Sequence, residues 1–236
     1  MLLFYIRHAD PIYNPDSLTE QGLLQAEALV QRMKICNPQK IFVSSSNRAR
    51  LTANPSAKAL GLEPEILDWC HEDKAWEDFS CIDARGKREW IFFQPEYAEV
   101  FNSDEMYKMG REWYRHSALS PVSAEKGWQR IKKETDDFMK SLGYIRQGRG
   151  YAAENVKYDR VALFAHQGFG LLFLSCLLDI PFPIFGTHFD IGHSGVSVVE
   201  LADSAFSIPR LIQLSNDSHI FADPRLKTNY QNRIEF

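Results

Sequence analysis

The sequence has few cysteines, no excess of basic residues and no cysteine pairs at metal-binding spacing. Its 236 residues include four cysteines, Cys36, Cys70, Cys81 and Cys176, none in a C-x-x-C pair. This scatter argues against a disulfide framework or a zinc site and favours buried free thiols in a reducing cytoplasm. The formal net charge of −4 and the pI of about 6.0 argue against a protein that mainly binds nucleic acid or an anionic membrane.

Long apolar runs and internal repeats are also absent from the sequence. The apolar run at residues 168–180 is too short to span a bilayer and predicts a buried helix, while residues 1–6 are too short and too soon followed by charge to form a signal peptide. The length and the hydrophobic content of 44% suit one large domain, or a domain with an insertion, around a well-filled core. We therefore expect a cytoplasmic globular protein.

Short apolar runs indicate the strands of an α/β sheet. Residues 2–6, 40–44 and 160–165 are typical of strands buried on both faces. Residues 195–201 and 210–214 predict a closing antiparallel pair.

Two helices are expected between the first three strands. Thr19 can cap a helix over residues 20–34, whose apolar stripe is predicted to be Leu23, Ala26, Val30 and Met33. The second helix is expected from about Asn47 to Gly61. Because Pro55 removes a backbone donor inside it, a kink or a break is predicted near Asn54.

Residues 73–157 differ from the rest, with four of the five tryptophans, mixed charges and amphipathic helical patterns. We interpret them as a largely helical insertion packed over one end of the sheet. Its last part, residues 143–159, is rich in glycine and polar residues and predicts an exposed, mobile connection in which Arg146 and Arg149 are solvated.

Residues suited to anion binding follow each of the three buried strands. Arg7 and His8 follow the first, Arg48 lies just after the second and His166 follows the third. Ligands of open α/β sheets bind beyond the carboxyl ends of the strands, so these side chains are expected to meet. Each residue alone could occur there by chance, but together they predict a cationic pocket for phosphate.

Four ordered motifs carry a resemblance to a known family. They are "RHAD" (7–10) with Asn14 at the family's spacing, "LTEQG" (18–22), "SSSNRARLTA" (44–53) and "AHQG" (165–168). The sequence resembles the histidine phosphatase superfamily, the phosphoglycerate-mutase-like fold, in its phosphatase branch. The resemblance implies a single α/β domain over residues 1–236, a three-layer αβα sandwich around a mostly parallel mixed sheet, with a core of about 1–72 and 158–236 and a cap of about 73–157.

The resemblance also implies a mechanism and its residues. His8 would be the nucleophile that forms a phosphohistidine, while Arg7, Asn14, Arg48 and His166 would hold the phosphoryl group. The implied activity is metal-independent hydrolysis of a small phosphorylated metabolite, with no cofactor and no nucleic-acid or membrane partner. The chain could form a homo-oligomer.

The proton donor for the leaving group is expected in "LDWCHED" (67–73), after the second helix. The spacing of the aromatic and acidic residues resembles one phosphatase branch and favours Glu72. Asp73 and Glu77 are the alternatives.

Other functions stay open at this point. Ala9 replaces the family's usual glycine and Gln167 stands where a small residue is common, so a degenerate member that binds a phosphorylated ligand without turnover is conceivable. A phosphoglycerate-mutase-type phosphotransferase is the nearest alternative chemistry, although the segment around Glu72 lacks the mutase's "ERHYG" pattern. A metallohydrolase is a weaker hypothesis, and its site would draw on His71, Glu72, Asp73, His188 and His193.

The substrate is open between a sugar phosphate, a nucleotide and a phosphorylated cofactor precursor. Aromatic residues of the insertion could line a pocket over the phosphate, but they more often form the core of such a segment. These residues are Trp76, Phe79, Trp90, Phe92 and Phe93.

Overall fold

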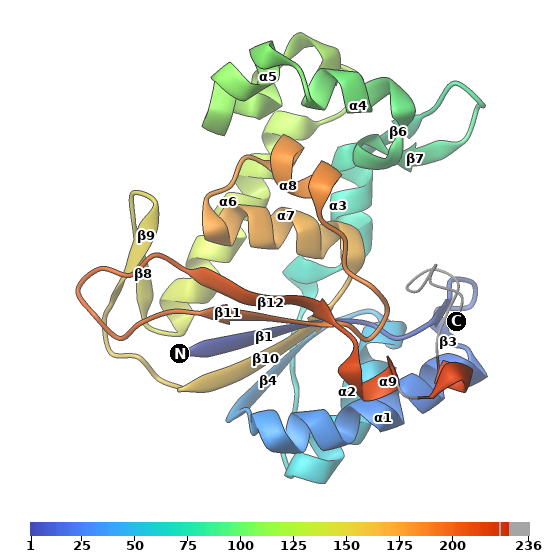
Figure 1. Ribbon diagram of the computed structural model, residues 1–236, viewed down its shortest axis with the longest axis vertical. Coiled ribbons are helices and arrows are strands. Elements are labelled where there is room, and N and C mark those ends of the chain that lie inside the picture. Colours follow the sequence, from blue (N-terminus) through green and yellow to red (C-terminus); the bar gives the residue numbers. More distant parts are fainter. Residues whose placement is uncertain (222, 227–236) are drawn as a thin grey trace.

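The computed structural model describes residues 1–221 and 223–226. Its centre is a six-stranded sheet in the order β12-β11-β1-β10-β4-β5 (Figure 1). The four parallel strands are β1 (Leu2–Arg7), β10 (Arg160–Ala165), β4 (Lys40–Ser44) and β5 (Glu65–Leu67). The antiparallel strands are β11 (Val196–Glu200) and β12 (Arg210–Asn216). The mostly parallel mixed sheet expected from the sequence is therefore confirmed.

The register of the sheet brings the ends of the central strands level. Arg7, at the end of β1, pairs with Ala165, at the end of β10. Residues that follow these two strands, such as His8 and His166, consequently emerge side by side at one edge. The strands are apolar because helices cover both faces of the sheet.

Helices α1 (Glu20–Cys36) and α2 (Asn47–Leu60) cover one face of the sheet (Figure 1). As expected, Thr19 caps α1, and its side chain accepts the Gly22 N–H. The predicted stripe is wrong at Leu23, which is 47% exposed. The buried stripe passes through Gly22 instead, because the start of α1 lies against the backbone of Asp10, where a Cβ on Gly22 would come within 2.2 Å of the carbonyl oxygen.

Helix α2 runs without a break through Pro55, so the break predicted near Asn54 does not occur. The alanines at 49, 53 and 57 are buried against the sheet on both sides of the proline. This packing stabilises the helix where a backbone hydrogen bond is missing.

Helices α3 (Glu72–Phe79), α6 (Ala124–Ser141) and α7 (Gln167–Leu178) lie over the opposite face, which completes three layers. Helix α7 is the buried helix expected from the apolar run at 168–180, and only its last residue is not buried. Farther from the sheet lie α4 (Pro95–Phe101), α5 (Asp104–Met109) and α8 (Phe182–His188) (Figure 1). The α/β sandwich with a largely helical addition is thus the observed architecture.

The remaining elements are short. Three hairpins pair β2 (Pro11–Ile12) with β3 (Ser17–Leu18), β6 (Ser80–Ile82) with β7 (Arg88–Trp90), and β8 (Tyr144–Gln147) with β9 (Gly150–Ala153). The other helical turns are α9 (Ser218–Phe221) and the 3₁₀ segments Asp68–Cys70, Ile91–Phe93, Gly110–Arg115, Ser117–Leu119 and Pro224–Leu226.

The prediction of an exposed, mobile connection at 143–159 is wrong. This segment contains the β8–β9 hairpin, in which Tyr144 and Tyr151 are fully buried. The guanidinium of Arg146 lies 4.6 Å from the Tyr151 ring centroid and bonds to Asp136 through Nε, so Arg146 is not solvated either. Arg149, at the turn, remains exposed as expected.

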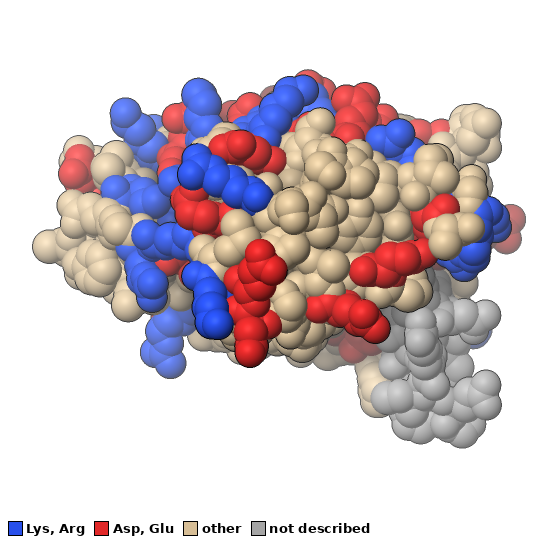
Figure 2. Space-filling model, turned by 90° about the horizontal axis from the view of Figure 1, so that it is seen from above, with Lys and Arg blue, Asp and Glu red and all other residues tan. Residues whose placement is uncertain are grey.

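All four cysteines are free thiols, as expected, but only Cys70 and Cys176 are buried, and the prediction of burial is wrong for Cys36 and Cys81, which are partly exposed. Seen from the side of α4 and α5, positive and negative side chains are interspersed, and this face shows no large area of one sign (Figure 2). None of the helices in the described part of the chain is long and apolar enough to cross a membrane.

Candidate active site

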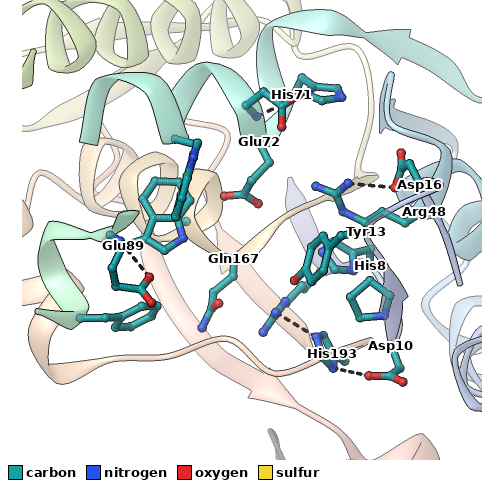
Figure 3. Close-up of a pocket in the computed structure, with 17 residues that line it drawn as sticks. His8, Asp10, Tyr13, Asp16, Arg48, His71, Glu72, Glu89, Gln167 and His193 are labelled. Atoms are coloured by element: carbon teal, nitrogen blue, oxygen red, sulfur yellow. Dashed lines mark hydrogen bonds and ion pairs between the residues drawn. The ribbon is translucent and has the colours of Figure 1, made fainter. Parts of the chain in front are cut away.

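A cavity of about 880 Å³ opens at the carboxyl ends of the central strands (Figure 3). Its floor comes from the ends of the strands and the first turn of α2, and its walls come from α3, β7, the start of α7 and the loop before β11. The lining includes Arg7, His8, Arg48 and Glu72, which the sequence singled out.

His8 lies at the floor and is only 2% exposed. Its Nδ1 lies 2.8 Å from the Ala9 carbonyl oxygen, which can only accept, so Nδ1 carries the proton and Nε2 keeps its lone pair. Burial, and then the charges of Arg7 and its other cationic neighbours, hold the pKa of His8 well below its usual value. The ring is therefore neutral and presents a nucleophilic nitrogen at neutral pH.

The Arg7 guanidinium is hydrogen-bonded to Ile191 and His193. Its Nη1 donates to the Ile191 carbonyl at 2.7 Å, and its Nη2 donates to Nε2 of His193 at 2.9 Å. His193 Nδ1 in turn lies 3.3 Å from Asp10 Oδ1. Burial and the charge of Arg7 lower the pKa of His193 to about 2, which keeps this imidazole neutral and able to accept from Arg7.

Arg48 is anchored in a similar way. Asp16 Oδ1 accepts from its Nη1 at 2.9 Å, and the other carboxylate oxygen of Asp16 accepts the Asn47 N–H at 2.6 Å. The guanidinium also lies 5.4 Å from the ring centroid of Tyr13, an exposed residue at the mouth of the cavity. Both arginines are thus fixed before any ligand arrives.

His166 is fully buried beside the floor, with its ring centroid 5.3 Å from that of His8. Arg48 Nη2 lies 3.2 Å from its Nδ1. Since a guanidinium only donates, Nδ1 accepts, and Nε2 carries the proton toward the Ser44 hydroxyl at 2.8 Å. Burial, followed by the charge of Arg48, holds the pKa of His166 well below its usual value.

Glu72 is the first residue of α3, and its carboxylate points into the cavity (Figure 3). Its Oε1 accepts the Phe169 N–H at 3.0 Å, at the start of α7, and its Oε2 lies 3.4 Å from His166 Nδ1. A side chain on Gly168 would overlap this contact, because a Cβ there would come within 2.7 Å of Oε1. The geometry therefore fixes one carboxylate beside His166, in the cavity that His8 also lines.

The two alternative proton donors lie farther out. Asp73 lines the cavity but is exposed, and its side chain lies 3.7 Å from His71 Nδ1. Glu77 is exposed and is not among the lining residues.

Asn14 is not brought to the cavity. It is exposed, and the lining residues of its loop are Pro11, Tyr13 and Asp16.

The two departures from the family pattern keep the site intact. Ala9 needs no positive φ, its carbonyl orients His8, and its N–H donates to the Thr52 hydroxyl at 2.9 Å. The Gln167 side chain donates to Asp190 at the edge of the cavity.

Sequence reasoning missed the residues that hold the arginines, namely Asp10, Asp16 and His193. A signal for His193 was present. The strand predicted at 195–201 runs antiparallel to β1, so the residues just before it lie beside the carboxyl end of β1, and the Ser194 N–H donates to the His8 carbonyl at 3.1 Å.

The aromatic residues of the insertion divide into two groups. Trp76, Trp90 and Phe93 line the cavity, whereas Phe79 and Phe92 are buried in the core. The pocket-lining interpretation is therefore correct for the first group of aromatic residues, and the core interpretation is correct for the second.

The proposed metal ligands do not assemble as a set. His188 is not among the cavity residues, and the described residues contain no group of three or more His, Cys, Asp or Glu side chains placed to hold a metal ion.

Comparisons with known proteins support the family resemblance and the fold. Residues 3–90 match the model of the histidine phosphatase superfamily (branch 1), which confirms the resemblance seen in the motifs. The match includes Arg7, His8, Arg48 and Glu72. A sequence search of the curated proteins found no match.

Solved structures show the same fold. The chain is similar to a phosphoserine phosphatase from Entamoeba histolytica (17% identity, TM-score 0.59, covering 93% of this chain and 99% of that one). It is also similar to a mycobacterial glucosyl-3-phosphoglycerate phosphatase solved with VO3 (16%, 0.58, 91% and 99%) and to the alpha-ribazole phosphatase from Shigella flexneri (17%, 0.58, 92% and 97%).

Proposed function

We propose that this protein is a phosphomonoester hydrolase that acts through a phosphohistidine on His8. The observation that carries the proposal is the surroundings of His8 Nε2. This nitrogen is unprotonated and lies on a cavity floor that also presents the guanidinium groups of Arg7 and Arg48. An attacking nitrogen between two fixed cations is what transfer of a phosphoryl group requires.

In the first step, His8 Nε2 attacks phosphorus and the bond between phosphorus and the ester oxygen breaks. The leaving oxygen takes a proton from the Glu72 carboxylic acid, which the Phe169 N–H holds in the same cavity as His8. In the second step, water attacks the phosphohistidine and gives one proton to the Glu72 carboxylate. Inorganic phosphate leaves, and His8 and Glu72 return to their starting states.

The charge that develops on the phosphoryl oxygens is met by Arg7 and Arg48. Because Asp16 and His193 already hold these side chains, little reorganisation is needed in the transition state. We assign His166 to positioning Arg48, because its Nδ1 accepts from Arg48 Nη2. Asn14 has no part in the proposal, because it is exposed and outside the cavity.

The similar structures support this assignment, since they include phosphatases, and one of them was solved with VO3. We expect the same kind of anion to bind here between Arg7, Arg48 and His8. The departures at Ala9 and Gln167 remove none of the groups used, which favours turnover over binding alone.

The test is the variant His8→Ala, assayed with p-nitrophenyl phosphate in the presence of EDTA because the proposed steps use no metal. We expect activity in the wild type, no turnover in the variant, and an acid-labile, base-stable phosphoryl adduct on His8 of the wild type only. The matched control is His188→Ala, an exposed histidine outside the cavity, which should retain the wild-type rate. Full activity of His8→Ala would refute the mechanism.

A further inference from the structure

The cavity extends well beyond the phosphate-binding residues. Figure 3 shows Glu89 on the opposite side of the cavity from His8 and Arg48, with Glu72 and Gln167 between them. Glu89 belongs to β7, one strand of a hairpin in the insertion. A leaving group attached to a phosphate on His8 would have to occupy this outer half of the cavity.

Aromatic rings form the wall of the outer half. Trp76 and Trp90 lie with ring centroids 4.9 Å apart and nearly perpendicular, at 84°, and Phe93 adds a third ring. Trp90 is only 8% exposed, and its ring packs so closely on α7 that a Cβ on Gly168 would come within 2.5 Å of it. The wall is therefore fixed to the same helix that holds Glu72.

The charge of the outer half is negative. Of the described residues that line the cavity, the only Lys or Arg side chains are Arg7 and Arg48, and both belong to the phosphate end. The carboxylate of Glu89 lines the other part. The guanidinium of Arg85 is not among the lining residues; it lies 2.7 Å from Asp83 Oδ2, and its charge also interacts with Glu89.

Glu89 is also held in place locally. Its Oε1 accepts the N–H of Trp90 at 2.8 Å, so the carboxylate stays beside the aromatic wall. A carboxylate next to aromatic rings is suited to a cation, because aromatic rings attract positive charge. An anionic leaving group would instead meet the Glu89 carboxylate, with no Lys or Arg among the described residues that line this half.

We propose that the substrate is a phosphomonoester whose leaving group carries an ammonium cation, held by Glu89 and by the aromatic wall of Trp76, Trp90 and Phe93. This inference rests on the proposed function, since it concerns the leaving group of the same reaction. The bond that breaks is still the one between phosphorus and the ester oxygen, and the ammonium group is released unchanged with the alcohol.

The experiment compares four esters on the wild-type protein. Choline phosphate carries the cation, 3,3-dimethylbutyl phosphate has the same shape without charge, 3-phosphoglycerate has an anionic leaving group, and p-nitrophenyl phosphate reports phosphatase activity as such. We expect kcat/KM for choline phosphate to exceed that for its neutral isostere by about tenfold or more, the size of a desolvated cation–π contact, with 3-phosphoglycerate lowest.

The variant Glu89→Gln should reduce the ratio of kcat/KM between choline phosphate and the neutral isostere toward one. Glu99→Gln, which removes an exposed carboxylate of α4 outside the cavity, should leave this ratio at its wild-type value. The ratio is informative even if a variant loses some activity through folding, because both substrates are affected equally.

The assays distinguish failure of the leaving-group inference from failure of the proposed phosphatase function. If p-nitrophenyl phosphate is hydrolysed but the neutral isostere or 3-phosphoglycerate equals or exceeds choline phosphate, the inference about the leaving group is wrong and the hydrolase stands. If none of the four esters is hydrolysed, the proposed function is wrong and the inference falls with it.

Discussion

Replacing Glu72 by glutamine tests the proton donor, the role for which the sequence left three candidates. The structure favours Glu72 because its carboxylate lies beside His166 in the cavity that His8 lines, whereas Asp73 is exposed and Glu77 lies outside the cavity. In Glu72→Gln the amide oxygen can still accept the Phe169 N–H, so the side chain should keep its place. What the variant loses is the proton.

The size of the loss depends on the leaving group. An alkyl phosphate must release a strongly basic alkoxide, so its phosphorylation step should slow by about 10²- to 10⁴-fold. That corresponds to about 3 to 5 kcal/mol of activation free energy. p-Nitrophenyl phosphate releases a stable phenolate and should slow far less in the same step.

The measurement is the pre-steady-state burst of leaving group, which reports formation of the phosphohistidine alone. Steady-state rates would mix in hydrolysis of the intermediate, where the same carboxylate accepts the proton of water. Glu77→Gln, on the same helix but outside the cavity, is the control and should leave both bursts unchanged. Equal slowing of the alkyl and aryl bursts, or none of either, would refute the role of Glu72 and transfer it to Asp73.

Three further outcomes follow from the contacts around the site. Asp16→Asn removes the charge that holds Arg48, so kcat/KM should fall by about tenfold, as for loss of a charged hydrogen bond, with an unchanged melting temperature as the control. Gly168→Ala places a Cβ within 2.5 Å of the Trp90 ring, so thermal unfolding should show a loss of about 1 to 3 kcal/mol. Burial first, and then a neighbouring guanidinium, lower the pKa of His193 from 6.5 to about 2, so the unfolded chain binds a proton below pH 6.5 that the folded chain does not. The free energy of unfolding should therefore be unaffected by His193 above pH 6.5 and should fall by about 2 kcal/mol between pH 6.5 and pH 5. Urea unfolding across this range would detect the fall, and a flat profile would contradict the prediction.

Much of the fold was predictable because its strands are short and continuously apolar. The runs at 2–6, 40–44 and 160–165 became β1, β4 and β10 because strands covered on both faces leave a clear signal. Residues 143–159 left no such signal. The burial of Tyr144 and Tyr151 depends on distant parts of the chain, where Tyr144 contacts the N-terminus of Met1 and Tyr151 pairs with Ser207, and local polarity does not reveal these contacts.

The candidate site was predictable where residues directly follow strands. Arg7, His8 and His166 were placed correctly at one edge because the ends of parallel neighbours are level. Asn14 shows the opposite case. Its role was carried over from spacing alone, and the loop that joins β2 to β3 leaves it exposed.

The residues that support the arginines were not predictable in this way, since their role depends on geometry. Asp16 reaches Arg48 from a loop 32 positions away, and His193 reaches Arg7 from 186 positions away. A carboxylate or an imidazole in a loop is common in any sequence, so only the folded chain shows which of them binds a guanidinium.

The two arginines meet two requirements of the proposed reaction at once. Their charges bind the phosphoryl oxygens, and after burial those same charges help to keep the pKa of His8 low, so that the nucleophile is neutral before the substrate arrives. A bound phosphate dianion would offset these charges and make protonation of the histidines easier. Once His8 has attacked, its Nε2 lone pair forms the bond to phosphorus and can no longer take a proton. His166 forms no such bond, so it is the histidine whose basicity should rise when phosphate binds.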